Sequence, residues 1–275
     1  MENHMKYIII GATVIFLLFG SKIYLDSEKP NDQSVKVDEN MHQVQENKKL
    51  ADELSATKER LSTIETAKNE LTTAEIVREW SPQVVYIVCS WYYSDGTFHT
   101  SASGSGFLTT FRDHSIAVMT NRHVILDQDK YVPKSCSVSF LNGEKYRVDW
   151  DTKSGGWSQS YDMGNIVIAR PSTETKNLVK RIDGYYCGIK PDIGEKIVVL
   201  GYPSIGSDIG ITATEGIISG YAGDYYIIDA KIDYGSSGGI AVSTKNNCIV
   251  GIPTLSVSSK IESLGRILSS EVILK

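Results

Sequence analysis

Residues 232–240 read IDYGSSGGI, and three glycines there surround two serines at the point where an alternating strand pattern stops. Two interpretations fit this stretch by itself. Glycine and serine are common in turns, so it can be a plain turn between two strands. It can also be a backbone shaped to present one serine as a nucleophile, because glycine adopts conformations that other residues avoid. The rest of the chain decides between them.

Short strand-like segments surround this stretch. Their β-branched and aromatic residues lie between Gly, Asp, Asn or Pro, which is typical of strands. They run from QVVYIVCSWYY, starting at Gln83, to CIVGIPTL, starting at Cys248. Many short strands at regular spacing indicate a sandwich or barrel. We expect residues 74–275 to form one all-β domain of two packed six-stranded barrels. A helix is expected at each end, over AEIVREW (74–80) and over SKIESLGRILSSEVIL (259–274).

The N-terminus carries an apolar segment, YIIIGATVIFLLFGSKIYL, from Tyr7 to Leu25. About 20 apolar residues suffice to cross a bilayer as a helix. A cleaved signal peptide is the alternative, but no A-x-A-like site follows, so residues 1–25 are predicted to be a single-pass anchor. Lys6 precedes the segment, and Asp26 and Glu28 follow it, which favours an N-terminus inside the cell. The bulk of the chain would then lie on the extracytoplasmic side of the membrane.

Residues 26–73 separate the anchor from the β-rich region as a polar linker that leads into a helix. From about residue 43 to 71 the apolar residues recur at three- and four-residue spacing, which is typical of a coiled coil. The row consists of Leu50, Leu54, Leu61, Ile64 and Leu71. Such a helix would give the chain a means of forming a homo-oligomer. Thr57 and Lys68 interrupt the row, so a solvated single helix acting as a spacer stays equally open.

Composition excludes several classes of protein. The 275 residues are 41% hydrophobic and 22% charged, as in ordinary globular proteins. The net charge is −5 and no basic run is present, so nucleic acid is not an expected partner. The four cysteines form no C-x-x-C pair, and we expect neither a metal site nor a cofactor.

Disulfides can form outside the cytoplasm. Cys136 and Cys187 both lie at strand margins and are the pair that we expect first. Cys89 continues the alternation of Val85 and Ile87, so it is predicted to be a core thiol.

Two further motifs carry chemistry. In SIAVMTNRHVI a strand leads directly to His123, where a rigid element can position an imidazole as a general base. In SYDMGNIVIAR, Asp162 comes just before an apolar strand and could accept the Nδ1 proton of that imidazole. A shifted alignment would place Asn165 there instead, and an amide would favour the wrong tautomer. Asp162 is the more coherent choice.

These motifs, together with SGSGFLTT, GYPSIG, TEGIISGY and IVGIPT, resemble in content and order the trypsin-like serine proteases of the HtrA/Deg type. The resemblance covers roughly residues 75–265. It implies a double β-barrel with the active site between the barrels. It also implies that Ser237, rather than Ser236, is the nucleophile, with His123 as base and Asp162 as its orienting acid. The backbone N–H groups of Gly235 and Ser237 would form the oxyanion hole.

The resemblance also implies a substrate pocket near Ile232 and the segment Ile252, Pro253 and Thr254. Lys231 stands six residues before the serine, where trypsin places an acid. We therefore expect small or aliphatic side chains before the cleaved bond. Family members usually carry C-terminal PDZ domains, and none is expected here.

The predicted function is that of a membrane-tethered serine endopeptidase acting on exposed or misfolded polypeptides. The alternative is a catalytically silent trypsin-like scaffold used for protein binding. Retention of the serine, histidine and aspartate together favours the enzyme.

Overall fold

The computed structural model describes residues 33–111, 113–127, 131–151, 153–182, 186–204, 210–258 and 263–273. The described chain divides near residue 63 into two units. The predicted anchor, residues 1–25, lies outside the described residues. None of the helices that are described is both long and apolar enough to cross a bilayer.

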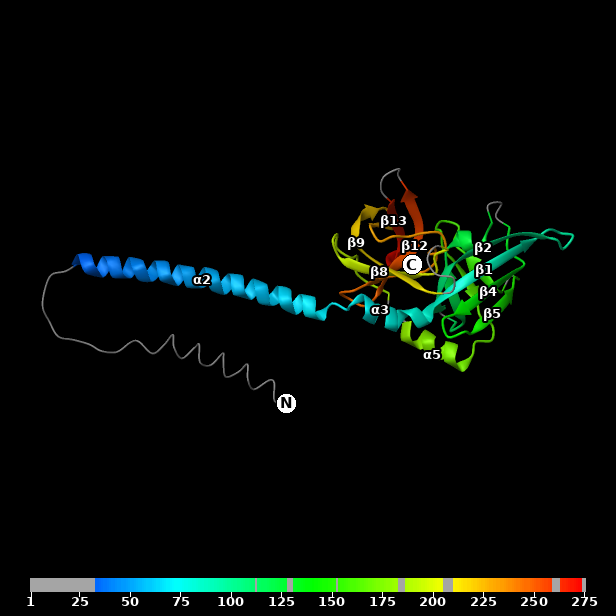
Figure 1. Ribbon diagram of the computed structural model, residues 1–275, viewed down its shortest axis with the longest axis horizontal. Helices are drawn as coiled ribbons and strands as arrows, with labels where there is room; N and C mark the ends of the chain where they lie inside the picture. Colours follow the sequence, from blue (N-terminus) through cyan, green and yellow to red (C-terminus); the bar gives the residue numbers. More distant parts are fainter. Residues whose placement is uncertain are drawn as a thin grey trace. The chain divides into compact units, whose positions relative to one another are not determined.

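Helix α2, Gln33–Asn69, is one continuous helix of 37 residues (Figure 1). It starts ten residues before the predicted start at residue 43, within the segment that we predicted as linker. Extending a helix that has already formed costs less than nucleating one, so weak helix formers can join its end. The side chains of residues 42–61 are all exposed.

The second unit contains two β-structures, which lie side by side in Figure 1. The first is a seven-stranded sheet in the order β5-β4-β1-β2-β3-β7-β6. Its strands are β1 Val84–Tyr92, β2 Phe98–Thr110, β3 Ile116–Thr120, β4 Ser135–Phe140, β5 Lys145–Asp149, β6 Gly155–Trp157 and β7 Gly164–Val167. We predicted a six-stranded barrel here, whereas the structure has a seven-stranded sheet whose end strands, β5 and β6, are not paired with each other. The added strand, β6, is only three residues long and too short for alternation to reveal.

The second β-structure is a closed six-stranded barrel in the order β10-β13-β12-β11-β8-β9, as predicted in strand number. Its strands are β8 Lys196–Gly201, β9 Thr212–Ala222, β10 Tyr225–Ile228, β11 Ile240–Ser243, β12 Ile249–Ser258 and β13 Ser263–Ser269. Closure pairs the first and last strands in the order, which removes exposed sheet edges. The all-β prediction for this part of the chain is confirmed.

Helix α3, Thr73–Trp80, confirms the predicted helix before the first strand. Thr72 and Glu75 form a capping box, which satisfies two of the free N–H groups at the start of the helix. Ile76 and Trp80 are buried, and the indole Nε1 of Trp80 donates to Oδ1 of Asn247 at 2.8 Å. The one-turn 3-10 helix η1, Ser81–Gln83, then leads into β1.

The predicted C-terminal helix was largely wrong. Ser263–Ser269 forms β13, and only Ser270–Ile273 is helical, as α6. Leu264, Ile267 and Leu268 fit a helical spacing as well as a strand, and pairing with β10 and β12 decides the outcome.

Helix α5, Thr173–Ile182, was missed, because its charged sequence carries few apolar residues. It contacts β2 and η1 (Figure 1).

Two disulfides correct the cysteine predictions. Cys89 pairs with Cys136, its direct neighbour across β1 and β4. Cys187 pairs with Cys248. Cys89 is in the core as predicted, but it is disulfide-bonded and is not a thiol. Its partner could not be predicted, because only the order of the strands in the sheet places Cys89 opposite Cys136. The predicted Cys136–Cys187 bridge is therefore absent. Each disulfide joins two segments of the same β-structure.

Candidate active site

His123 lies on a single helical turn, α4, Arg122–Ile125, directly after β3. The apolar residues of the turn, Val124 and Ile125, are 1% and 0% exposed and fix it against the sheet. The side chain of His123 is 49% exposed. A rigid strand and a buried half-turn thus hold an imidazole that still reaches solvent.

Asp162 lies just before β7 and contacts this histidine twice. Its Oδ2 is 2.7 Å from Nδ1 of His123, and its Oδ1 accepts the backbone N–H of His123 at 3.1 Å. The hydroxyl of Thr254 also donates to Oδ2. The side-chain amide of Asn121 donates to the carbonyl of Asp162 at 2.6 Å and fixes its backbone. Three hydrogen bonds therefore hold the carboxylate, and a fourth holds the backbone of the same residue.

Burial by itself would raise the pKa of Asp162. The hydrogen bonds and charge of His123, together with the Thr254 hydroxyl, outweigh burial and hold that pKa below its usual range. Asp162 is thus kept ionised beside the imidazole. Such a carboxylate fixes the ring orientation and the proton on Nδ1, which leaves Nε2 as the free basic nitrogen.

Asn165, the alternative acid position, lies three residues further on within β7. It pairs with Met119 of β3 and Gly156 of β6. The structure brings Asp162, and not Asn165, to His123. Asn165 occupies a half-buried sheet position.

Arg122 connects the histidine turn to the loop before Asp162. Its guanidinium donates to the carbonyls of Ser158 and Gln159, at 3.0 and 3.1 Å. An arginine has several donors in a fixed plane, so one side chain can hold two carbonyls at once. This contact was not predicted, although Arg122 adjoins His123 in the sequence.

The loop before β11 contains the opening GSSGG stretch. Gly235 has φ +92° and Gly238 has φ +87°, values that side chains disfavour. A Cβ at Gly238 would also collide with the carbonyl of Ser105. The glycines are thus required by backbone conformation and close packing.

Hydrogen bonding in this loop leaves two N–H groups free. The N–H of Ser236 donates to Asp233 at 2.9 Å, and that of Gly238 donates to Pro253 at 3.0 Å. Within the part of the chain that the structure describes, the N–H groups of Gly235 and Ser237 have no acceptor. Two nearby unpaired donors of this kind suit a developing negative oxygen.

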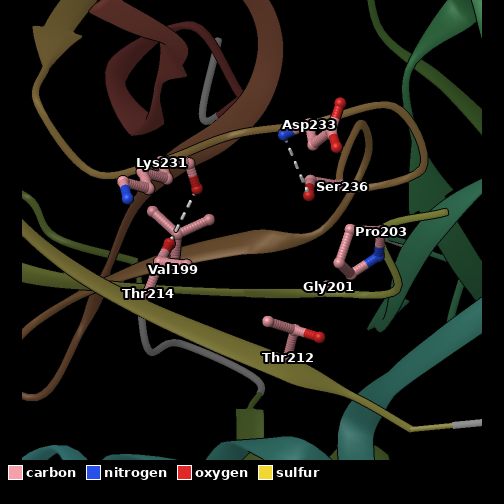
Figure 2. A pocket seen from close by; sticks show the side chains of 8 residues that line it. All are labelled: Val199, Gly201, Pro203, Thr212, Thr214, Lys231, Asp233 and Ser236. Atoms are coloured by element: carbon pink, nitrogen blue, oxygen red, sulfur yellow. Dashed lines mark hydrogen bonds between the residues drawn. The ribbon is translucent and has the colours of Figure 1, made fainter. Parts of the chain in front are cut away.

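The two serines face opposite sides of the loop. Ser237 lines a cleft of about 1290 Å³ together with His123. Ser236 lines a separate cavity of about 160 Å³, where Figure 2 shows it with Asp233 and Thr214. Only Ser237 therefore shares a cavity with the imidazole. Its hydroxyl donates weakly, at 3.5 Å, to the carbonyl of Thr254.

Ser105 of β2 braces the loop and was not predicted. It is fully buried, and its hydroxyl donates to the carbonyl of Gly235 at 2.6 Å while accepting the N–H of Tyr202 at 2.7 Å. Its own N–H donates to the carbonyl of Ser237 at 2.8 Å. The motif SGSGFLTT contains Ser105, but only the fold reveals its contacts.

The predicted pocket residues lie mostly inside the protein. Ile252 is 0% exposed and belongs to the core, and Thr254 is 2% exposed, with its hydroxyl on Asp162. The carbonyl of Pro253 accepts the N–H of Gly238. Ile232 is half-buried and approaches Gly265. Contact of these four residues with substrate stays a prediction.

Comparison with known proteins agrees with this geometry. The model of the family described as trypsin-like peptidase domain matches residues 104–252, which is more than half of the chain and includes His123, Asp162 and Ser237. The chain belongs to the trypsin-like peptidase family.

Relatives within this family are of the HtrA type. "Serine protease HTRA1A" of Danio rerio is 30% identical over 202 residues, which are 68% of this chain and 37% of that protein. "Serine protease HTRA3" of Mus musculus is 29% identical over 205 residues, covering 68% of this chain and 40% of that protein. The chain thus spans about two fifths of the length of these curated relatives.

A solved structure, the serine endoprotease from Yersinia pestis, superposes with a TM-score of 0.54 and 25% identity. The match covers 74% of this chain and 64% of that one. The likeness supports the trypsin-like double-barrel fold reached from the strands.

Proposed function

We propose that this chain is a serine endopeptidase that hydrolyses peptide bonds in exposed or misfolded polypeptides. The observation that carries the proposal is the 2.7 Å contact between Nδ1 of His123 and Asp162, together with the position of His123 in the same cleft as Ser237. The family match and the HtrA-type relatives support the same class of reaction.

In the proposed mechanism the Ser237 hydroxyl turns from the Thr254 carbonyl toward Nε2 of His123. The imidazole takes its proton as Oγ attacks the substrate carbonyl, and Asp162 stabilises the imidazolium. The N–H groups of Gly235 and Ser237 bind the oxyanion. The imidazolium then protonates the leaving amine, and water hydrolyses the acyl-enzyme through the same base.

The contact between Ser237 and Thr254 favours a second candidate, the silent scaffold, because the hydroxyl donates to the Thr254 carbonyl and not to the imidazole. The 3.5 Å separation makes this a weak hydrogen bond. Catalytic hydrogen bonds in substrate-free enzymes are often long or misaligned and tighten when substrate binds, so this contact does not exclude catalysis.

Two adjacent serines give a matched experiment. Labelling with a fluorophosphonate should modify wild type and Ser236→Ala but not Ser237→Ala. Peptide hydrolysis should fall by about 10⁶ in Ser237→Ala, as in other triad knockouts. Circular dichroism checks that both variants fold. A folded wild type that neither reacts with the probe nor cleaves peptides would support the scaffold.

We also propose that the N-terminal apolar segment tethers the peptidase to a membrane, with the catalytic unit on the extracytoplasmic side. The support is its length and the flanking charges. Cell fractionation should place the chain with membranes, and deletion of residues 1–30 should release it. A shortened soluble form in cells expressing the whole chain would instead indicate a cleaved signal peptide.

A further inference from the structure

Helix α2 carries a row of leucines that face solvent. Leu50, Leu54 and Leu61 are 56%, 58% and 54% exposed. Thr57 continues the row, and its hydroxyl donates to the carbonyl of Glu53 on its own helix at 2.8 Å. Thr57 therefore brings no unpaired polar group to the row, which can be covered by another apolar surface.

The spacing of this row defines a heptad register. Leu54 and Leu61 fall at a positions, and Leu50 and Thr57 at d positions. Asn47 and Asn40 then fall at a positions, one and two heptads before Leu54. An asparagine at an a position favours two strands and fixes their register at some cost in stability, because each amide can pair with its counterpart.

The charges beside the row are complementary for a parallel pair. Glu53 occupies a g position and Lys58 an e position. In parallel, in-register coiled coils a g residue faces the e residue five positions later on the partner, so Glu53 faces Lys58 twice by symmetry. Positions 60 and 65, the next such pair in the sequence, are Arg and Glu.

Neither Glu53 nor Lys58 has an ion-pair partner among the residues that the structure describes. These two charges are therefore available to a second helix. An antiparallel pair would place g against g and e against e, and both attractions would be lost.

We propose that α2 binds α2 of a second copy of this chain as a parallel, in-register, two-stranded coiled coil. The exposed leucines supply the seam, Asn47 selects the register, and the Glu53–Lys58 pairs select the orientation. The proposal is independent of the peptidase chemistry, since none of these residues belongs to the cleft.

Cysteine cross-linking on the full chain in mild detergent tests the orientation. The described cysteines are all in disulfides, so an introduced thiol is readily distinguished. Leu50→Cys, Leu54→Cys and Leu61→Cys should each give a disulfide-linked dimer on mild oxidation. The control, Asp52→Cys, sits at an f position on the opposite face and should stay unlinked. Linkage of only one leucine position would indicate an antiparallel pair and overturn the proposal.

Charge reversal tests the partner contacts. Glu53→Lys or Lys58→Glu alone should weaken dimerisation about 5- to 20-fold, because each replaces two attractions with two repulsions. The double variant Glu53→Lys/Lys58→Glu should return to within about threefold of wild type. The dissociation constants can be measured by sedimentation in density-matched detergent. A monomer at all concentrations, or a dimer insensitive to all three variants, would overturn the proposal.

Discussion

The hydroxyl of Ser105 joins three segments of the site: β2, the loop after β8, and the GSSGG loop. It is fully buried, so removing it leaves the carbonyl of Gly235 and the N–H of Tyr202 without a partner. Each such loss costs about 1–3 kcal/mol. Because Gly235 supplies a proposed oxyanion donor, part of this cost should appear in the transition state.

We therefore expect Ser105→Ala to lower kcat about 10- to 100-fold with KM little changed. Ser243→Ala is the matched control. Ser243 is also fully buried, and its hydroxyl donates to Glu195 at 2.6 Å within the barrel. Steady-state kinetics and urea unfolding of both variants separate positioning from stability. Equal loss of turnover in the two would mean that Ser105 acts through stability alone.

Replacing Asp162 and Asn165 in turn tests the orienting acid. Loss of the Asp162 carboxylate should lower kcat by about 10⁴, because the imidazole loses its favoured tautomer. Asn165→Ala should keep turnover within about tenfold, since Asn165 lies within β7 away from the imidazole. Steady-state kinetics of both variants on one peptide substrate measure these two changes in kcat. Near-normal turnover of Asp162→Ala with a defective Asn165→Ala would reverse the assignment.

The lowered pKa of Asp162 has a consequence for stability. When a folded-state pKa lies below the unfolded value, the unfolded chain binds more protons between the two, so stability rises with pH there. The contribution of the ionised Asp162 carboxylate to stability is complete above the ordinary aspartate pKa of about 3.9. It is lost as the pH falls through the lower pKa of the folded state. The stability advantage of wild type over Asp162→Asn should therefore shrink below about pH 4. Urea unfolding at several pH values measures it, and a constant difference would contradict the expected linkage.

At the scale of elements, the sequence predicts strands better than helices. Alternation of buried residues in β1 and the apolar run of β8 identify those strands directly. β13 was mistaken for a helix because its few apolar residues suit both a helical and a strand spacing. Only pairing with β10 and β12 makes the segment a strand. The stripe of α5 consists of only Leu178, Val179 and Ile182 among charged residues, and it was not recognised as a helix. The local sequence pattern does not predict the secondary structure where pairing or packing with distant segments determines the conformation.

The same distinction applies within the site. His123, Asp162 and Ser237 could be identified because motif neighbours mark their positions. Ser105 and the second role of Thr254 could not, since both depend on segments far apart in the sequence that meet only in the fold. The disulfide pairing was missed for the same reason.

The disulfides give a prediction for the elements that they join. Cys187 and Cys248 close a loop of 61 residues, and Cys89 and Cys136 close one of 47. Cys187→Ser/Cys248→Ser should lower the free energy of unfolding by about 2–5 kcal/mol. Thiol titration in denaturant should find no reactive cysteine before reduction and four after it. Titratable thiols in the unreduced chain would contradict both pairings.

At the scale of the whole molecule, the cleft should prefer small or aliphatic side chains before the cleaved bond. This expectation rests on the family resemblance, which puts Lys231 and Ile232 near the substrate pocket, where neither offers a carboxylate to a basic side chain. In the structure Lys231 lines the smaller cavity, and the one carboxylate residue among the described residues that line the cleft is Asp127. Cleavage of a peptide library should favour Ala, Val or Ile over Arg or Lys by about tenfold or more. Strong cleavage after Arg or Lys would refute this specificity.

Each disulfide begins and ends within one β-structure, and this determines what a single cut does to the chain. A nick between residues 89 and 136, or between 187 and 248, leaves two fragments tied by a covalent bridge. A nick between residues 137 and 186 leaves nothing covalent between the halves. Denaturation without reductant should then separate them, so the masses of the unreduced fragments report whether self-digestion has occurred in the connection between the two β-structures.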